Sequence, residues 1–205
     1  MDNIVLSIGR QFGSGGGEIG RKLADELHIP YYDRELLAIA ARESGLCPEI
    51  FEKADERESS GLSYAFPLGF SPPGMYLPCD DMLSNEKLFL LQSETIRNLA
   101  ERESCVIIGR CSDYILRDNP NCLSLFIHNT LQNRVKHVTA RENVSESRAK
   151  ELIAKADKSR AAYYNYYTNK QWGFAASYSF SIDVSVLGID GTVAFLKDFI
   201  VKRFK

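Results

Sequence analysis

The most informative stretch of the chain lies near its amino terminus and reads Ile4-Val5-Leu6-Ser7-Ile8-Gly9-Arg10-Gln11-Phe12-Gly13-Ser14-Gly15-Gly16-Gly17. Its first five residues are mostly apolar and predict a buried strand, which the glycines then break into a loop. Apolar residues return after the loop at helical spacing, as Ile19, Leu23, Ala24 and Leu27. Small residues between a strand and a helix let backbone N–H groups converge on an anion at the positive end of the helix. The stretch therefore predicts a phosphate-binding loop at residues 13–17.

The rest of the chain repeats this alternation of strand and helix. Short apolar runs predict strands at residues 29–33, 105–108, 121–127 and 179–184. Helical segments are expected at residues 36–41, 48–57, 83–102, 131–141 and 145–167, and a closing helix is expected with Asp190 as its N-cap. Because strands separated by helices form a parallel sheet with helices on both faces, we predict an α/β fold with three α/β/α layers.

The domain organisation is predicted to be one domain over residues 1–205, with a variable loop or insert near residues 46–82 and a lid region near residues 150–170. Residues 59–78 hold four of the seven prolines. A loop of this length in a compact domain commonly covers a binding site, and an excursion without any ligand contact is the equally open alternative.

Charge and cysteine content limit the classes of partner. The 205 residues include 25 Lys and Arg against 27 Asp and Glu, so no net positive field favours nucleic acid or an anionic membrane, and any anion site must be local. No apolar run approaches the roughly 20 residues that span a bilayer, and no secretory signal pattern is present, so we expect a cytoplasmic protein. The five cysteines contain no Cys-x-x-Cys pair and the three histidines have no ligand spacing, so we expect reduced thiols and no metal held by side chains.

Two phosphate-binding motifs compete for the glycine loop. The dinucleotide pattern Gly-x-Gly-x-x-Gly fits residues 15–20, but it requires an acidic residue about 20 positions further on, and Asp33 comes too early. The P-loop pattern Gly-x-x-x-x-Gly-Lys-[Ser/Thr] lacks its lysine and its hydroxyl: if Gly16 is the last loop glycine, Gly17 stands at the lysine position. Three hypotheses stay open, namely an ATP-dependent phosphotransferase, a regulatory module that binds a nucleotide or phosphate without turnover, and a dinucleotide-dependent oxidoreductase.

Three blocks of sequence resemble the cytidylate kinase-like family of bacterial P-loop proteins. They are Ser7-Ile8-Gly9-Arg10-Gln11-Phe12-Gly13-Ser14-Gly15-Gly16, Ile29-Pro30-Tyr31-Tyr32-Asp33-Arg34-Glu35-Leu36 and Val106-Ile107-Ile108-Gly109-Arg110-Cys111-Ser112-Asp113-Tyr114-Ile115-Leu116. Later landmarks follow in the same order, as Asp157-Lys158-Ser159-Arg160, Trp172-Gly173 and Leu187-Gly188-Ile189-Asp190. The resemblance implies a P-loop nucleoside monophosphate kinase-like fold. It also implies phosphoryl transfer from ATP to CMP, another nucleoside monophosphate or a small acceptor, with Mg²⁺ bound mainly through the phosphates.

The resemblance also implies which residues act in the reaction. Proteins of this kind position two nucleotides and neutralise the charge on the moving phosphoryl group, so arginines carry most of the chemistry. The implied catalytic residues are Arg10, Arg110 and Arg160. Arg10 could replace the charge of the absent lysine, with a planar fork in place of a point charge.

Four residues are implied as contacts of the acceptor: Asp33, Arg110, Asp113 and Asp157. Gly109-Arg110 resembles the start of a Gly-Arg-Asp segment that binds the acceptor, with Cys111 in place of the acid and Asp113 two residues later. Asp157 and Arg160 match the Asp-x-x-Arg of the lid helix. Further basic residues are expected either near the same cleft or at the solvated surface, namely Arg34, Arg42, Arg134, Lys155 and Lys158.

Overall fold

The structure of the protein is a computed structural model, and it describes residues 3–33 and 85–204. Several expectations fall outside these residues and stay predictions. They are the helices at residues 36–41 and 48–57, the insert near residues 46–82, the loop at residues 59–78, and the roles of Arg34 and Arg42.

The centre of the molecule is a parallel sheet of five strands in the order β2-β3-β1-β4-β5. The strands are β1 (Val5–Arg10), β2 (Tyr31–Tyr32), β3 (Cys105–Ile108), β4 (Cys122–His128) and β5 (Phe180–Asp183). β1 lies between β3 and β4, with Val5 level with both Cys105 and Cys122. All four residues of β3 and the first four of β1 are buried, as expected for strands covered on both faces.

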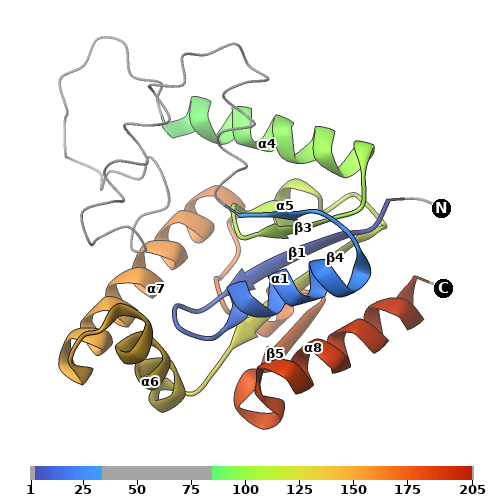
Figure 1. Cartoon of the computed structure of the whole chain (residues 1–205). Coiled ribbons are helices and arrows are strands. Elements are labelled where there is room, and N and C mark those ends of the chain that lie inside the picture. Colours follow the sequence, from blue (N-terminus) through green and yellow to red (C-terminus); the bar gives the residue numbers. More distant parts are fainter. Residues whose placement is uncertain (1–2, 34–84, 205) are drawn as a thin grey trace.

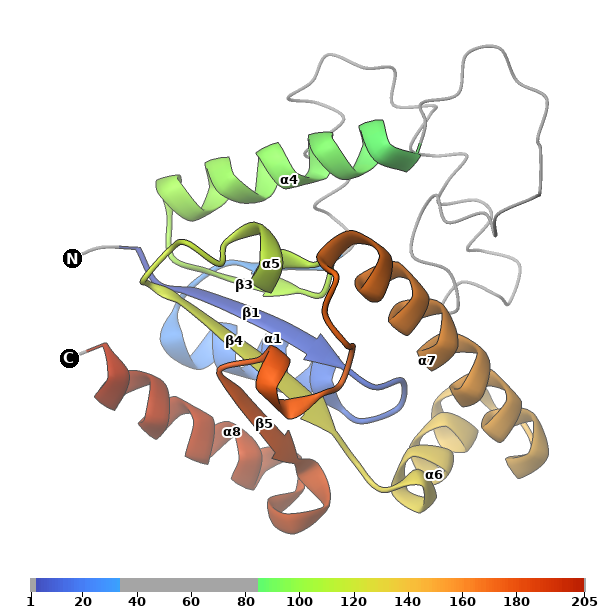
Figure 2. The same ribbon diagram turned by 180° about the vertical axis from the view of Figure 1, so that it is seen from behind.

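Helices cover both faces of the sheet, which confirms the predicted three layers (Figures 1 and 2). α1 (Gly16–Leu27) and α8 (Val184–Arg203) pack together on one face, where Ile19, Leu23 and Leu196 are fully buried. α4 (Asn85–Arg102), the one-turn α5 (Ser112–Ile115) and the end of α7 (Glu146–Thr168) enclose a second core cluster on the other face. α6 (Leu131–Glu142) pairs with α7, and a short 3-10 turn (Ala175–Ser177) precedes β5.

The closing helix differs from the prediction at its start. α8 begins at Val184 because Asp183 caps it, accepting the Ser185 N–H at 2.9 Å. The helix is interrupted at Gly188, which has a φ of 67°. Asp190, the predicted cap, instead pairs with Lys22 of α1 at 2.6 Å. The long segment of α8 therefore starts just after Gly188, near the predicted start, and a short helical segment capped by Asp183 precedes it.

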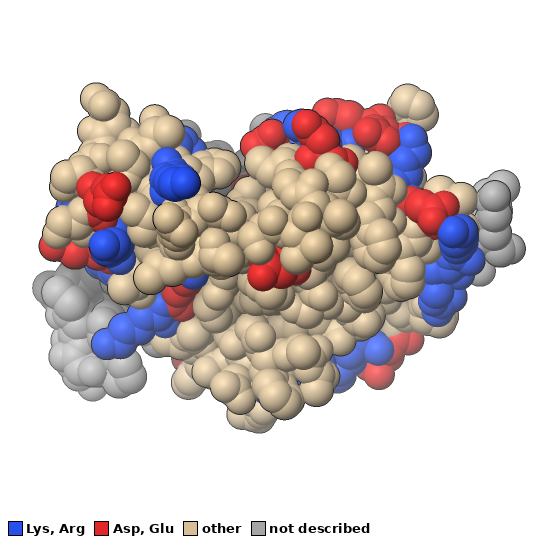
Figure 3. Space-filling view, turned by 90° about the horizontal axis from the view of Figure 1, so that it is seen from below, with Lys and Arg blue, Asp and Glu red and all other residues tan. Residues whose placement is uncertain are grey.

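The surface reflects the nearly equal numbers of basic and acidic residues in the chain. Figure 3 shows basic and acidic side chains intermixed along the margins of one face, around a centre with few charges. In residues 3–33 and 85–204, no helix is both long and apolar enough to cross a membrane.

Candidate functional site

The loop between β1 and α1 depends on two glycines in the left-handed region. Gly13 has a φ of 76° and Gly15 a φ of 87°, a conformation that favours glycine. A Cβ on Gly13 would also lie 2.7 Å from Val138 Cγ2 of α6. The turn is closed from within, since the Gly16 N–H donates to Ser14 Oγ at 3.2 Å. The loop therefore brings the amino end of α1, with the positive end of its dipole, to the carboxyl edge of the sheet.

The structure shifts the position of the motif by one residue. Gly15 is the N-cap of α1, and its carbonyl oxygen accepts the Ile19 N–H at 2.9 Å. Gly15, and not Gly16, is therefore the last loop glycine, and Gly16 rather than Gly17 stands at the lysine position. The sequence missed this because three consecutive glycines offer equivalent starting points for the helix. The absence of the lysine and of the hydroxyl is unchanged, because residues 16 and 17 are both glycines.

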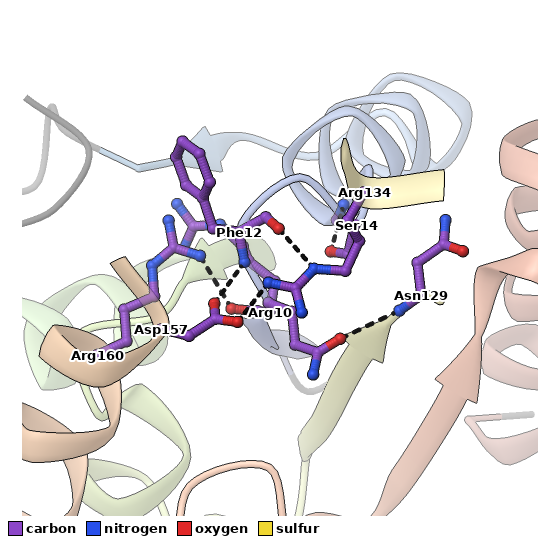
Figure 4. Close-up of polar contacts among 9 residues, drawn as sticks. Arg10, Phe12, Ser14, Asn129, Arg134, Asp157 and Arg160 are labelled. Carbon is purple, nitrogen blue, oxygen red and sulfur yellow. Dashed lines mark hydrogen bonds and ion pairs between the residues drawn. The ribbon is translucent and has the colours of Figure 1, made fainter. Parts of the chain in front are cut away.

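Two side chains of α6 and α7 hold the backbone of Phe12, at the start of the loop (Figure 4). Asp157 accepts the Phe12 N–H at 2.8 Å, and Arg134 Nε donates to the Phe12 carbonyl at 2.8 Å. Arg134 and Asp157 also form an ion pair with each other, and their side chains are 6% and 19% exposed. The Phe12 ring is buried among α6 and α7 residues that include Val138 and Ile153. Arg134, Asp157 and Phe12 therefore form a clamp that fixes the loop against α6 and α7.

This clamp gives Asp157 a different setting from the expected acceptor contact. Its two carboxylate oxygens face the Phe12 N–H and the Arg134 guanidinium. Arg134, expected only as a basic residue near the cleft, is one of the most buried charged groups of the site. The sequence carried no signal for this pairing, because Phe12, Arg134 and Asp157 meet only through the packing of three separate elements.

Arg10, Arg160 and Asp33 come together beside the loop. Arg160 Nη1 donates to the Arg10 carbonyl at 3.0 Å, and the Arg160 guanidinium lies 5.5 Å from the centre of the Phe12 ring. Arg10 Nη2 pairs with Asp33 Oδ1 at 3.2 Å, and these side chains are 19% and 28% exposed. Burial, followed by the positive charge of Arg10, lowers the pKa of Arg160, although an arginine keeps its charge at neutral pH. Two of the predicted catalytic arginines and one predicted acceptor residue thus share one site.

Arg110 lies at the end of β3, in a turn that is unusual for its residue types. Gly109, Arg110 and Cys111 have φ values of 68°, 59° and 55°. A left-handed conformation costs about 1–2 kcal/mol for an ordinary residue, so the surrounding contacts must hold this turn. Ser112 Oγ donates to the Gly109 carbonyl at 2.8 Å, and Gln92 Nε2 donates to the Arg110 carbonyl at 3.3 Å.

The Arg110 side chain is half-buried and makes no hydrogen bond or ion pair within residues 3–33 and 85–204. Gly109 lies close to the side chain of Arg10 at the end of β1, since a Cβ on Gly109 would lie 3.1 Å from Arg10 Nη1. The residue before Arg110 therefore lies against Arg10 at the sheet edge, and the Arg110 guanidinium has no partner within the described residues that a ligand would need to displace.

Asp113 lies away from the loop, in the first turn of α5. It is 9% exposed and accepts the Tyr164 hydroxyl of α7 at 2.7 Å. Burial raises the pKa of this carboxyl. Burial also raises the pKa of the Cys111 thiol, which keeps it protonated at neutral pH. The structure thus ties Asp113 to α7 in the core, and does not bring it to Arg10 and Arg160.

No group of three or more His, Cys, Asp or Glu side chains in the described part of the chain could hold a metal ion. The expectation that no metal is held by side chains concerns the whole chain, and outside these residues it stays a prediction.

Comparisons with known proteins give a family and a fold. Residues 5–186 match the model of a family described as the cytidylate kinase-like family. No curated protein matches the chain. A solved structure of an uncharacterized protein from Eubacterium ventriosum ATCC 27560 is 30% identical, with a TM-score of 0.71 over 97% of this chain and 98% of the other.

Two shikimate kinases have related structures at much lower identity. The enzyme from Bacteroides thetaiotaomicron is 13% identical, with a TM-score of 0.54 over 96% of this chain and 98% of the other. The enzyme from Acinetobacter baumannii, solved in complex with shikimate, is 13% identical, with a TM-score of 0.51 over 98% of this chain and 94% of the other. At this identity the likeness shows the fold alone, and it confirms the predicted P-loop kinase-like fold.

Proposed function

This chain belongs to the cytidylate kinase-like family, and from that premise we propose that it is a nucleotide-binding phosphotransferase. In this proposal Gly13, Ser14, Gly15, Gly16 and Gly17 hold the phosphates of ATP. An oxygen of the acceptor attacks the terminal phosphorus, and the bond to the bridging oxygen breaks to release ADP. The acceptor class is CMP, another nucleoside monophosphate or a small molecule with a phosphorylatable group.

One observation carries the proposal: the amino end of α1 begins directly after two left-handed glycines and lies against Arg10, whose backbone carbonyl accepts Arg160 Nη1. Backbone N–H groups at such an end bind anions, and their effect adds to that of the helix dipole. The two guanidiniums supply local positive charge although the whole chain has a formal net charge of −2. This combination suits a phosphate better than an uncharged ligand.

The proposed roles follow from where each side chain lies. Arg10 and Arg160 neutralise charge on the transferring phosphoryl group, and Arg110, whose side chain has no partner within residues 3–33 and 85–204, joins them from the acceptor side. Asp33, next to Arg10, contacts the acceptor. Asp157 and Asp113 act as positioning residues, because their contacts are with Phe12, Arg134 and Tyr164.

We also propose that residues 1–205 form a single domain in which α7 carries the lid region near residues 150–170.

The loop does not suit direct binding of Mg²⁺ by the protein. Gly17, at the position where the motif has a hydroxyl, has no side chain, and Ser14 Oγ already accepts the Gly16 N–H. Mg²⁺ therefore belongs to the proposal only as a companion of the nucleotide, bound through phosphate oxygens. No step proposed here depends on a metal ligand from the chain.

The proposal is tested by calorimetric titration with ATP and CMP, each with Mg²⁺, beside a coupled assay of ADP release over a panel of nucleoside monophosphates and small hydroxylated acids. We expect ATP to bind and ADP to appear only with the right acceptor. Arg110→Gln and Arg160→Gln should each lower turnover by about 100-fold, the usual loss when one charge-stabilising donor is removed. Arg148→Gln, which removes an exposed arginine of α7, is the matched control and should leave turnover unchanged.

A second function is favoured by the glycines at the lysine and hydroxyl positions. They leave an intact backbone loop but remove two groups that act during transfer. The chain would then be a regulatory module that binds a nucleotide without turnover. ATP binding with no ADP release over the whole panel would select this alternative, and absence of any binding of ATP or CMP at millimolar concentration would refute both.

A further inference from the structure

We propose that positions 10 and 16, which touch each other, carry exchanged residue types relative to the P-loop motif: a basic residue stands where the motif has a small one, and a small residue stands where the motif has a basic one. Arg10, at the end of β1, supplies the charge that a lysine supplies in other P-loops, and Gly16 makes room for it. This inference rests on the proposed function and deepens it, because it identifies the residue that carries the charge of the lysine.

The first step of the argument is the position of the motif. In Gly-x-x-x-x-Gly-Lys, the first glycine precedes the last glycine by five residues, and the lysine follows directly. Gly15 caps α1 and is the last loop glycine. The first glycine position therefore falls on Arg10, and the lysine position falls on Gly16. The chain has a basic residue where the motif has a small one, and a small residue where the motif has a basic one.

The second step is steric. A Cβ on Gly16 would lie 2.7 Å from Arg10 Cβ and 3.3 Å from Ile127 Cβ. Real Cβ atoms essentially never come within 3.0 Å of another atom, as this one would with Arg10 Cβ. Arg10 Cβ is attached directly to the backbone of β1, so it cannot rotate away. A side chain at position 16 and a side chain at position 10 therefore exclude each other. Gly17 is different, because the nearest atom to its Cβ position is the Tyr31 hydroxyl oxygen at 3.8 Å.

The third step is electrostatic. The Arg10 side chain extends from the end of β1 past Gly109, and its guanidinium pairs with Asp33. The backbone carbonyl of Arg10 accepts a hydrogen bond from Arg160 Nη1. The pair with Asp33 neutralises the charge of a guanidinium whose side chain is only 19% exposed. A phosphate offers the same fork of two oxygens that a carboxylate offers, so it can replace Asp33 as the partner of Arg10. The charge thus approaches the phosphate from the sheet edge, and not from the first turn of α1.

The test is a set of four variants: Arg10→Gln, Arg10→Gly, Gly16→Lys, and Arg10→Gly with Gly16→Lys, which together recreate Gly-x-x-x-x-Gly-Lys. Calorimetry measures the affinity for ATP with Mg²⁺ and for inorganic tripolyphosphate. We expect Arg10→Gln and Arg10→Gly to bind both probes about 10-fold or more weakly, because each loses a charge-assisted bidentate contact. The double variant should recover most of that loss. Arg148→Gln, on the outer face of α7, is the control and should bind like the wild type.

A second measurement does not depend on any ligand. Gly16→Ala adds only the Cβ, so it should lower the midpoint of thermal unfolding when Arg10 is present and lower it much less when combined with Arg10→Gly. This pair of variants also keeps the proposal testable if Gly16→Lys alone fails to fold.

Three results distinguish the failures. Wild-type protein that binds neither ATP nor tripolyphosphate overturns the proposed function. Wild-type binding that Arg10→Gln changes by less than about 2-fold overturns the role of Arg10, while the proposed function stands. A folded double variant that binds no more tightly than Arg10→Gly overturns the exchange.

Discussion

The clamp formed by Arg134, Asp157 and Phe12 gives a quantitative prediction for Asp157→Ala. The substitution leaves the Arg134 guanidinium, 6% exposed, without its counter-charge, and it leaves the Phe12 N–H without its acceptor. Removing one partner of a buried ion pair costs about 3–5 kcal/mol of unfolding free energy. Asp157 is 19% exposed and Arg134 keeps its bond to the Phe12 carbonyl, so we expect the lower end, about 3 kcal/mol.

Asp157→Asn separates the charge from the hydrogen bond. The amide oxygen can still accept the Phe12 N–H, so we expect a smaller cost of about 1–2 kcal/mol. Urea unfolding followed by circular dichroism measures both values. In thermal unfolding of a chain of this size, about 3 kcal/mol corresponds to a fall in Tm of about 6–12 °C.

Glu151→Ala is the matched control on the same helix. Glu151 pairs with Arg148 at 2.8 Å, but these side chains are 62% and 52% exposed, so the loss should stay within about 0.5 kcal/mol. If Asp157→Ala costs no more than Glu151→Ala, the reasoning fails, because the pair would then not hold the loop.

Three further predictions concern glycine, carboxyl and thiol positions. Gly13→Ala should destabilise the fold by more than about 1 kcal/mol in urea unfolding, because a left-handed alanine is strained and its Cβ would meet Val138; a neutral result would mean that the loop readily changes conformation. Burial raises the pKa of Asp113, so the folded state holds this proton more tightly than the unfolded state, and stability falls as pH rises from the ordinary aspartate range through the raised value. Wild type should therefore lose stability relative to Asp113→Asn over that window, and parallel pH profiles would contradict the assignment. Burial raises the pKa of Cys105 to about 12, so iodoacetamide should label this residue in peptide mapping only after unfolding; rapid labelling of the native protein would show that β3 is accessible.

Apolar runs, helical spacing and glycines in the sequence were sufficient to predict the layers of the fold and the position of the loop. The strand at residues 105–108 and the helix at residues 145–167 were predicted at nearly the observed bounds of β3 and α7, because apolar runs and helical spacing reflect burial directly. The loop could be placed because left-handed positions such as 13 and 15 favour glycine, and the sequence shows the glycines directly. The prediction failed where several residues satisfied the same pattern, as in the position of the lysine within three glycines.

Contacts between distant elements were beyond the reach of that pattern. The bond of Tyr164 to Asp113 and the clamp on Phe12 each join elements that the sequence separates, and no periodicity connects them. The three αL residues at the end of β3 were also unpredictable, because arginine and cysteine rarely adopt that conformation without support from a surrounding structure.

The sequence alone was enough to predict an α/β chain with a glycine loop between its first strand and first helix and with no lysine in that loop, since composition and periodicity record burial, turns and charge. The three-dimensional arrangement was needed to show that Arg10 lies against Gly16, that Arg160 and Asp33 contact Arg10, and that Asp157 binds the loop backbone. The physical reason is the parallel sheet, which brings the carboxyl ends of β1, β2 and β3 to one edge and so places residues far apart in the chain within reach of one another.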